Sequence, residues 1–133
     1  MPKEGETFYY IMGDGIIADN VYYQIFTVNK NRLAMGNCFK TKEDAELALK
    51  KHMVYQELKQ FADENNGPID WNDERSHKYS IACSHEEIKR LYITCWATYQ
   101  FMGCVWFSSM ELAEQAIQKV GEDRIKKYLF GVK

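Results

Sequence analysis

The sequence predicts an α+β fold, built as a tandem pseudo-repeat of two βββα units with antiparallel sheets and helices packed on one face. The main observation is that Met35–Leu49 (MGNCFKTKEDAELAL) is echoed by Met102–Ile117 (MGCVWFSSMELAEQAI). In both stretches an apolar, β-rich run ends at a hydroxyl residue that opens a helical pattern. The pairs matched at one constant spacing are Phe39 and Phe107, Glu43 and Glu111, Ala45 and Ala113, Glu46 and Glu114, and Ala48 and Ala116.

The first unit opens with a predicted β-hairpin. Thr7–Met12 is rich in aromatic and β-forming residues, Gly13–Gly15 is a turn, and Ile16–Ala18 is the returning strand. Arg32–Phe39 is predicted to be the third strand of the sheet. The pattern of Tyr22–Asn31 (YYQIFTVNKN) fits either a strand or a structured loop, so both conformations stay open.

A long helix is predicted from Thr41 to about Asp63 or Glu64. Thr41 is placed as its N-cap with Asp44 completing a capping box, and the run NNGP stops the helix. The apolar side of this helix changes face near Met53, because the apolar positions before and after it lie well apart around the helix axis. We therefore expect the first half to cover its own sheet and the second half to dock on the other repeat.

The boundary between the units is predicted in Gly67–Ser76 (GPIDWNDERS), which is polar and rich in turn residues. This gives a first repeat over residues 1–66, a linker over 67–76 and a second repeat over 77–133, all within one compact domain. The second repeat is expected to contain strands at Lys78–Cys83, Lys89–Ala97 and Tyr99–Phe107, a helix from Ser109 to Gly121, and a short helix at Glu122–Tyr128 followed by an apolar tail.

Composition excludes several classes of protein. A net charge of −2 disfavours a protein whose affinity depends on neutralising phosphates. The beginning of the sequence lacks a signal-peptide pattern, and no apolar run approaches the roughly 18 residues of a membrane span. The four cysteines have no CxxC spacing and are expected to be reduced and buried. These observations predict a soluble, intracellular protein without a membrane partner.

The sequence carries no recognisable catalytic or metal-binding motif. It contains no P-loop, no HExxH and no nucleophile elbow. The repeat aligns His52 with Val120, so His52 is expected to be a core or half-buried structural histidine. The spacing of His77, Cys83 and His85 matches no standard zinc pattern. We therefore expect no enzyme activity, no cofactor and no metal site.

The aromatic residues of the predicted strands are more informative. If the matched residues Tyr9 and Tyr79 face the helices, then Phe8 and Tyr10 face away from them, and Tyr92 and Trp96 share the corresponding face of the second sheet. Three outcomes stay open: the two sheets pack on each other, the aromatic face binds a partner protein, or it stacks nucleic-acid bases.

Two resemblances bear on function. The phrase FKTKEDAELAL resembles the strand-to-helix junction of the arm-type DNA-binding domains of phage and transposon integrases. Over nearly the whole chain, the order YYI, GNCFKTKEDAE, IDWNDE, KYSI, VWFSSMELAEQAI and GEDRIKKYLFGVK looks like a small accessory protein family of phages, prophages and mobile elements in Gram-positive bacteria. This second resemblance implies an accessory product of the bacterial cytoplasm, of the kind that often antagonises host defence, as anti-CRISPR proteins do.

We therefore expect a non-enzymatic, phage-encoded binding protein that antagonises a nucleic-acid-directed host defence system by occluding a surface of a host protein. The residues expected to bind this partner are Asp14, Asp19, Trp71, Asp73, Glu74, Tyr92 and Trp96. A first alternative is a nucleic-acid-binding regulator that uses the aromatic sheet face together with Lys78, Lys89 and Arg90. A second alternative is a structural homodimer module.

Overall fold

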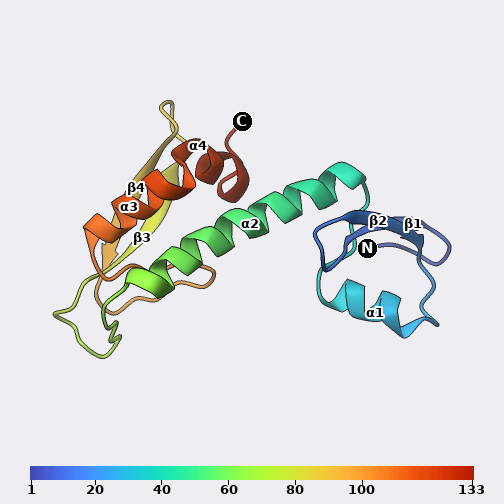
Figure 1. The fold of residues 1–133 in the computed structure, drawn as a ribbon, viewed down its shortest axis with the longest axis horizontal. Helices are drawn as coiled ribbons and strands as arrows, with labels where there is room; N and C mark the ends of the chain where they lie inside the picture. Colours follow the sequence, from blue (N-terminus) through green and yellow to red (C-terminus); the bar gives the residue numbers. More distant parts are fainter. The chain divides into compact units, whose positions relative to one another are not determined.

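A computed structural model describes residues 1–133 and shows an α+β fold with two two-stranded antiparallel sheets and four helices (Figure 1). The chain divides into two units, Met1–Lys51 (unit 1) and His52–Lys133 (unit 2), which are described separately. This division falls inside the long helix α2, upstream of the predicted linker Gly67–Ser76, which contains no helix or strand. None of the helices combines the length and the apolar character that crossing a lipid bilayer requires.

The hairpin of unit 1 confirms the sequence prediction. Strand β1 (Thr7–Ile11) pairs with β2 (Ile17–Val21), with Tyr9 opposite Asp19. The turn between them closes through the N–H of Gly15, which donates to the carbonyl of Met12 at 2.9 Å. Gly15 has a φ of 82°, a conformation that residues with a Cβ rarely adopt.

The segment after this hairpin differs from the prediction, because Thr27–Ala34 forms helix α1. Of the segment Tyr22–Asn31, residues 22–26 form a loop, as one of the two predicted conformations has it, and the helix begins at Thr27. The predicted third strand Arg32–Phe39 is wrong. Its inward positions Asn29, Arg32 and Leu33 follow helical spacing. The side-chain amide of the buried Asn29 donates to the carbonyl of Tyr23 at 3.1 Å, which ties the start of α1 to the preceding loop.

The place of the missing third strand is taken by two residues. Phe39 exchanges two backbone hydrogen bonds with Tyr9, both of 2.8 Å. Asn37 uses its side-chain amide in place of a peptide group: its Oδ1 accepts from the N–H of Ile11 at 2.7 Å, and its Nδ2 donates to the carbonyl of Ile11 at 2.8 Å. A full strand is therefore not needed to satisfy this edge of β1.

The outer face predicted for the first sheet is covered. Phe8 is buried, and its ring centroid lies 6.1 Å from that of Tyr22. The guanidinium of Arg32, on α1, lies 3.7 Å from the ring centroid of Tyr10. Helix α1 therefore covers this face of the first sheet, for which the sequence pattern suggested a binding partner or the second sheet.

Helix α2 (Lys42–Asn65) begins and ends close to the predicted positions. The hydroxyl of Thr41 accepts from the N–H of Asp44 at 3.1 Å, which confirms the predicted cap. The change of face is also confirmed, because Ala45 is buried within unit 1 whereas the buried positions Val54 and Leu58 belong to unit 2. His52 is exposed, so its predicted place in the core is wrong.

Unit 2 contains the hairpin of β3 (Lys78–Ser84) and β4 (Arg90–Trp96), both close to their predicted bounds. Helix α3 (Met110–Val120) lies against one face of this hairpin (Figure 1). The hydroxyl of Ser109 accepts from the N–H of Leu112 at 3.2 Å, as expected for the predicted N-cap. The buried core of unit 2 consists of Val54, Leu58, Phe61, Ala62, Phe107, Ala113, Ala116, Val120 and Ile125.

The third strand predicted for unit 2, Tyr99–Phe107, is also wrong. Only Phe107 pairs with the sheet, exchanging backbone hydrogen bonds of 2.9 and 2.8 Å with Tyr79. The tandem βββα repeat is therefore not observed, since each unit has two strands and a single bridging residue. After Gly121 the chain forms α4 (Glu122–Arg124) and a π-helical turn, η1 (Ile125–Leu129), where the sequence predicts a short helix.

Candidate partner-binding surface

The face of the β3–β4 hairpin opposite α3 gathers half of the aromatic side chains of unit 2, including all three tryptophans. Tyr79, Ile81, Leu91 and Ile93 pack against the core, so the alternating positions of both strands point to the other face. The loop Ala97–Trp106 and the linker add further rings on that side. We call the six aromatic residues together the aromatic surface: Trp71, Tyr92, Trp96, Tyr99, Phe101 and Trp106.

Five of these rings form a continuous chain of contacts. The ring of Trp96 lies 4.9 Å from Phe101 and 6.0 Å from Tyr99, both nearly edge-on. Phe101 stacks on Trp106 at 6.2 Å with an interplanar angle of 17°. Trp106 in turn meets Trp71 edge-on at 4.8 Å. Such offset and edge-to-face pairs are the favoured geometries of aromatic rings, so the loop and the linker hold one another in place.

Much of this aromatic area stays in contact with solvent. The exposed fraction is 68% for Tyr99, 44% for Phe101, 41% for Tyr92 and 37% for Trp96. No charged residue occurs in Ala97–Trp106 (ATYQFMGCVW). Exposed aromatic and methionine side chains without charges are the composition of the core of a protein interface. The surface is therefore built of the material that binding sites for proteins use.

Lys78 lies beneath the aromatic surface and is fully buried. Its Nζ donates to the carbonyl of Asp73 at 2.9 Å and to the carbonyl of Ala97 at 2.6 Å. The same ammonium lies 5.2 Å from the ring centroid of Trp71. Lys78 thus ties the linker to the end of β4. Its ammonium is removed from solvent, whereas the predicted role as a contact for nucleic acid needs an exposed cation.

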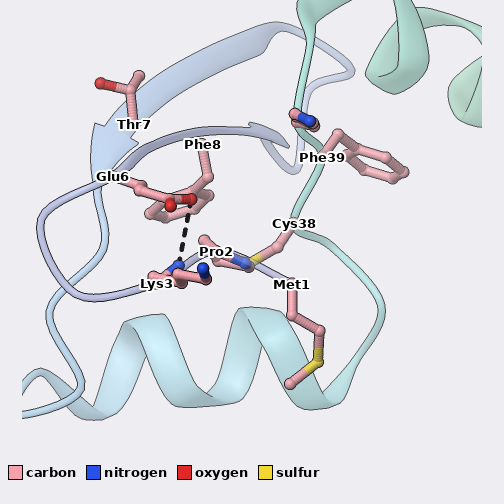
Figure 2. A pocket seen from close by; sticks show the side chains of 9 residues that line it. Met1, Pro2, Lys3, Glu6, Thr7, Phe8, Cys38 and Phe39 are labelled. Atoms are coloured by element: carbon pink, nitrogen blue, oxygen red, sulfur yellow. Dashed lines mark hydrogen bonds between the residues drawn. The ribbon is translucent and has the colours of Figure 1, made fainter.

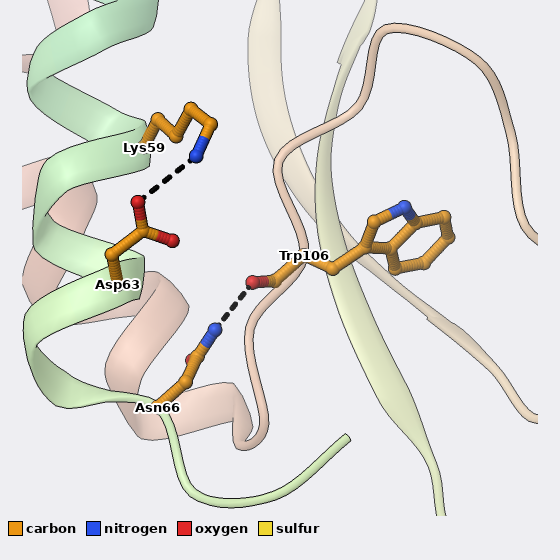
Figure 3. Close-up of polar contacts among 4 residues, drawn as sticks. All are labelled: Lys59, Asp63, Asn66 and Trp106. Atoms are coloured by element: carbon orange, nitrogen blue, oxygen red, sulfur yellow. Dashed lines mark hydrogen bonds and ion pairs between the residues drawn. The ribbon is translucent and has the colours of Figure 1, made fainter. Parts of the chain in front are cut away.

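Asn66, just after α2, fixes the backbone that carries Trp106 (Figure 3). Its Nδ2 donates to the carbonyl of Trp106 at 2.8 Å, while its Oδ1 accepts from the N–H of Ser108 at 2.9 Å. Figure 3 shows the indole pointing away from α2. The ion pair between Lys59 and Asp63 in the same view lies on the solvent-exposed side of α2, where such pairs contribute little to stability.

The predicted partner-binding residues fall into two groups. Trp71 and Trp96 belong to the same chain of aromatic contacts, and Tyr92 lies on the same face of the hairpin. Asp73 and Glu74 are exposed in the linker that carries Trp71. Asp14 and Asp19 are exposed as well, but they lie in the hairpin of unit 1, outside this surface.

The two remaining cations predicted for the alternative function are exposed at one end of the hairpin. The guanidinium of Arg90 lies 4.8 Å from the ring centroid of Tyr92, and its Nε donates to the Tyr92 hydroxyl at 2.8 Å. The ammonium of Lys89 donates to the carbonyl of His85. Both side chains are therefore engaged locally while remaining open to solvent.

Three members of the surface, Tyr99, Phe101 and Trp106, are absent from the predicted set. They lie in the segment predicted to be a strand, whose alternate residues would have faced the core. The available signal was compositional, because a ten-residue stretch with three aromatic residues and no charge is unusual for a solvent-facing loop.

Unit 1 contains a separate pocket of about 300 Å³ (Figure 2). Phe8, Cys38 and Phe39 line it together with the first residues of the chain and the exposed Lys40. Burial raises the pKa of the Cys38 thiol above its ordinary value, and the charge of Arg32 opposes this without reversing it. A raised pKa keeps the thiol protonated and poorly nucleophilic, so this pocket has no activated cysteine.

The structure contains no group of three or more His, Cys, Asp or Glu side chains placed to hold a metal ion. All four cysteines are free. The expectation that they are buried is wrong, because Cys38, Cys83 and Cys104 are half-buried and Cys95 is exposed. Cys95 pairs with Tyr79 across the hairpin, near the end of β4.

Comparison with models of known protein families, with curated proteins and with solved structures found no match in any of the three cases.

Proposed function

We propose that this chain is a non-enzymatic binding protein that recognises a partner protein through its aromatic surface. The observation that carries the proposal is the run of contacts from Trp96 through Phe101 to Trp106, in which Trp96 and Phe101 are exposed. Rigid aromatic side chains lose little conformational entropy on binding and dominate the energetics of interfaces. Because the rings of this surface already contact one another, little ordering remains to oppose association.

The kind of partner follows from the charges beside the aromatic rings. The uncharged loop is flanked by the linker, in which Asp70, Asp73 and Glu74 outnumber the single cation Arg75. Acidic groups on this side of an apolar centre favour a partner that carries lysine and arginine on the facing side of its own site, while Arg90 packs on Tyr92 at the end of the hairpin. Proteins that bind nucleic acid have such surfaces. We propose that the chain occludes one of them.

The biological setting of the proposal rests on the resemblance of the chain to accessory proteins of phages and prophages. We propose an antagonist of a nucleic-acid-directed host defence system, similar in role to anti-CRISPR proteins and acting in the bacterial cytoplasm. The acidic linker beside the aromatic surface supports this role, since a competitor of nucleic acid needs negative charge near its contact residues.

We also propose that the two units descend from one duplicated unit. Three correspondences support a common origin. Tyr9 bridges Phe39 as Tyr79 bridges Phe107, and a hydroxyl cap follows two residues after each phenylalanine. A glycine with positive φ also precedes each bridge, Gly36 at 74° and Gly103 at 73°.

The binding proposal is tested with the immobilised chain and a lysate of a Gram-positive host. Phe101→Ala removes an exposed ring from the surface, and Phe26→Ala removes a similarly exposed ring, 56% against 44%, from unit 1. We expect one host protein to be retained by the unmodified chain and by Phe26→Ala, but lost with Phe101→Ala. If Phe101→Ala retains the host protein as well as Phe26→Ala does, the proposed site is contradicted.

A second experiment separates this proposal from the nucleic-acid alternative. Binding of labelled DNA and RNA to the chain is measured at increasing salt concentrations. In parallel, the capture of the host protein is repeated with a lysate that has been treated with nuclease. We expect no appreciable retention of nucleic acid, and capture of the host protein that survives the nuclease. Tight binding of DNA or RNA with a steep salt dependence would favour the regulator and overturn the proposed function. Restored plating of a defence-sensitive phage in cells that express the chain tests the antagonist role.

A further inference from the structure

Strand β4 has one edge that no other part of the chain occupies. On β3, the N–H and C=O of Tyr79 point to Phe107, away from β4. Its partner across the ladder, Cys95, must therefore point its own backbone groups away from β3. Successive residues of a strand alternate, so Leu91 and Ile93 offer their N–H and C=O at the same edge. No hydrogen bond within the chain reaches these backbone groups.

The equivalent edge of unit 1 is protected, which makes the contrast informative. By the same reasoning from Tyr9 and Phe39, the free edge of β2 is formed by Asp19 and its alternate neighbours. Asp19 places a carboxylate there, and the N–H of Val21 is already taken by the side chain of Asn20 at 2.8 Å. Charges, short strands and occupied donors are the usual devices that prevent edge-to-edge pairing.

Strand β4 has none of these devices at the centre of its edge. It is seven residues long, contains no proline, and carries a single charge, on Arg90 at its first position. Exposed strands of this kind are templates for a further strand. A two-stranded sheet also gains stability from additional strands.

We propose that β4 pairs antiparallel with β4 of a second copy of this chain, joining the two β3–β4 hairpins into one four-stranded sheet. The sequence of the strand is self-complementary about a two-fold axis at Ile93. In this register the outward-pointing residues face one another, so each exchanges both backbone hydrogen bonds. The opposed pairs are Ile93 with Ile93, Leu91 with Cys95, Tyr92 with Thr94, and Arg90 with Trp96.

The side chains of β4, like its backbone groups, favour this antiparallel pairing. Arg90 would lie opposite the indole of Trp96 in the second copy, and not opposite another Arg90, so no like charges meet. On the other face, Leu91 and Ile93 extend the apolar layer that packs on the core of unit 2. The aromatic surfaces of the two copies would then share one face of the joined sheet. This inference stands independently of the proposed partner.

The test begins with the unmodified chain under reducing conditions. Sedimentation at increasing concentration is expected to show a monomer–dimer equilibrium. Amide hydrogen exchange is then measured by NMR above and below the midpoint. The amides of Leu91, Ile93 and Cys95 should exchange rapidly in the monomer and become protected in the dimer, while that of Thr94, inside the hairpin, stays protected in both. A chain that stays monomeric at millimolar concentration overturns the proposal, as does a dimer that leaves these three amides unprotected.

A matched pair of variants supplies the second arm. Cys95→Pro removes an N–H that makes no bond within the chain, so the hairpin ladder itself is retained. Cys95→Ser keeps that N–H and changes the side chain alone. We expect self-association to weaken at least about tenfold with proline and to be unchanged with serine. Equal association of both variants would overturn the proposed edge. If circular dichroism shows that the proline variant is unfolded, the exchange pattern of the unmodified chain decides.

Discussion

Lys78 is the buried cation on which the aromatic surface depends, and Lys78→Met should lower the free energy of unfolding of unit 2 by about 2–4 kcal/mol. Methionine keeps the apolar stem but removes the ammonium, which donates to two carbonyls at 2.9 and 2.6 Å. A hydrogen bond from a charged donor contributes about 1.5–3 kcal/mol net. Water can reach the carbonyls of the linker once the cation is gone, which recovers part of the loss. The contact with Trp71 contributes about 1 kcal/mol more.

The measurement is urea unfolding followed by tryptophan fluorescence. All three tryptophans lie in unit 2, so their emission reports on this unit alone. For a unit of this size the predicted loss corresponds to a fall in Tm of roughly 10–20 °C. Lys89→Met is the control, because Lys89 is exposed and donates to one carbonyl, and it should change the unfolding free energy by less than about 0.5 kcal/mol. A Lys78→Met variant as stable as this control would refute the reasoning.

Three further predictions follow from single contacts. Asn66→Ala removes both bonds that hold the backbone around Trp106, so it should destabilise unit 2 by about 2 kcal/mol in urea unfolding and shift the tryptophan emission of the native state. Ser109→Ala removes the N-cap of α3 and should cost about 1 kcal/mol by the same assay, whereas Ser109→Asp should retain most of the stability. At pH 8, Cys38 should react with iodoacetamide more slowly than the exposed Cys95, because burial raises the pKa of the Cys38 thiol and lowers its thiolate fraction. Equal rates in peptide mass spectrometry would contradict this, and the difference should disappear in denaturant.

The elements that could be predicted from the sequence are those encoded by local signals. The hairpin turn at Gly13–Gly15 and the hydroxyl caps at Thr41 and Ser109 depend on neighbouring residues, and all of them occur in the structure. The two partners of α2 were also predictable, since they depend on the angular spacing of its apolar residues. Both third strands failed for a common reason. A single bridging phenylalanine, helped by the amide of Asn37, satisfies the edge of β1 that a strand was expected to pair with.

The candidate site was only partly predictable. Trp71, Tyr92 and Trp96 were identified from strand alternation and from their place in a polar linker, and they share a surface in the structure. Lys78 is buried, although a lysine at the start of a strand resembles a solvent-facing cation. Its burial depends on carbonyls at Asp73 and Ala97, on either side of it in sequence, and only the tertiary fold brings them together.

The two units share an architecture but differ in what covers the outer face of each sheet. Both contain a hairpin, a bridging phenylalanine and a capped helix. Unit 1 covers its outer sheet face with α1, and Asp19 places a carboxylate on its free edge. Unit 2 covers the corresponding face with an uncharged aromatic loop and leaves the edge of β4 open. Unit 1 therefore builds the same hairpin and bridging phenylalanine without an aromatic loop on that face. Under the proposed function, this difference assigns recognition of the partner to unit 2.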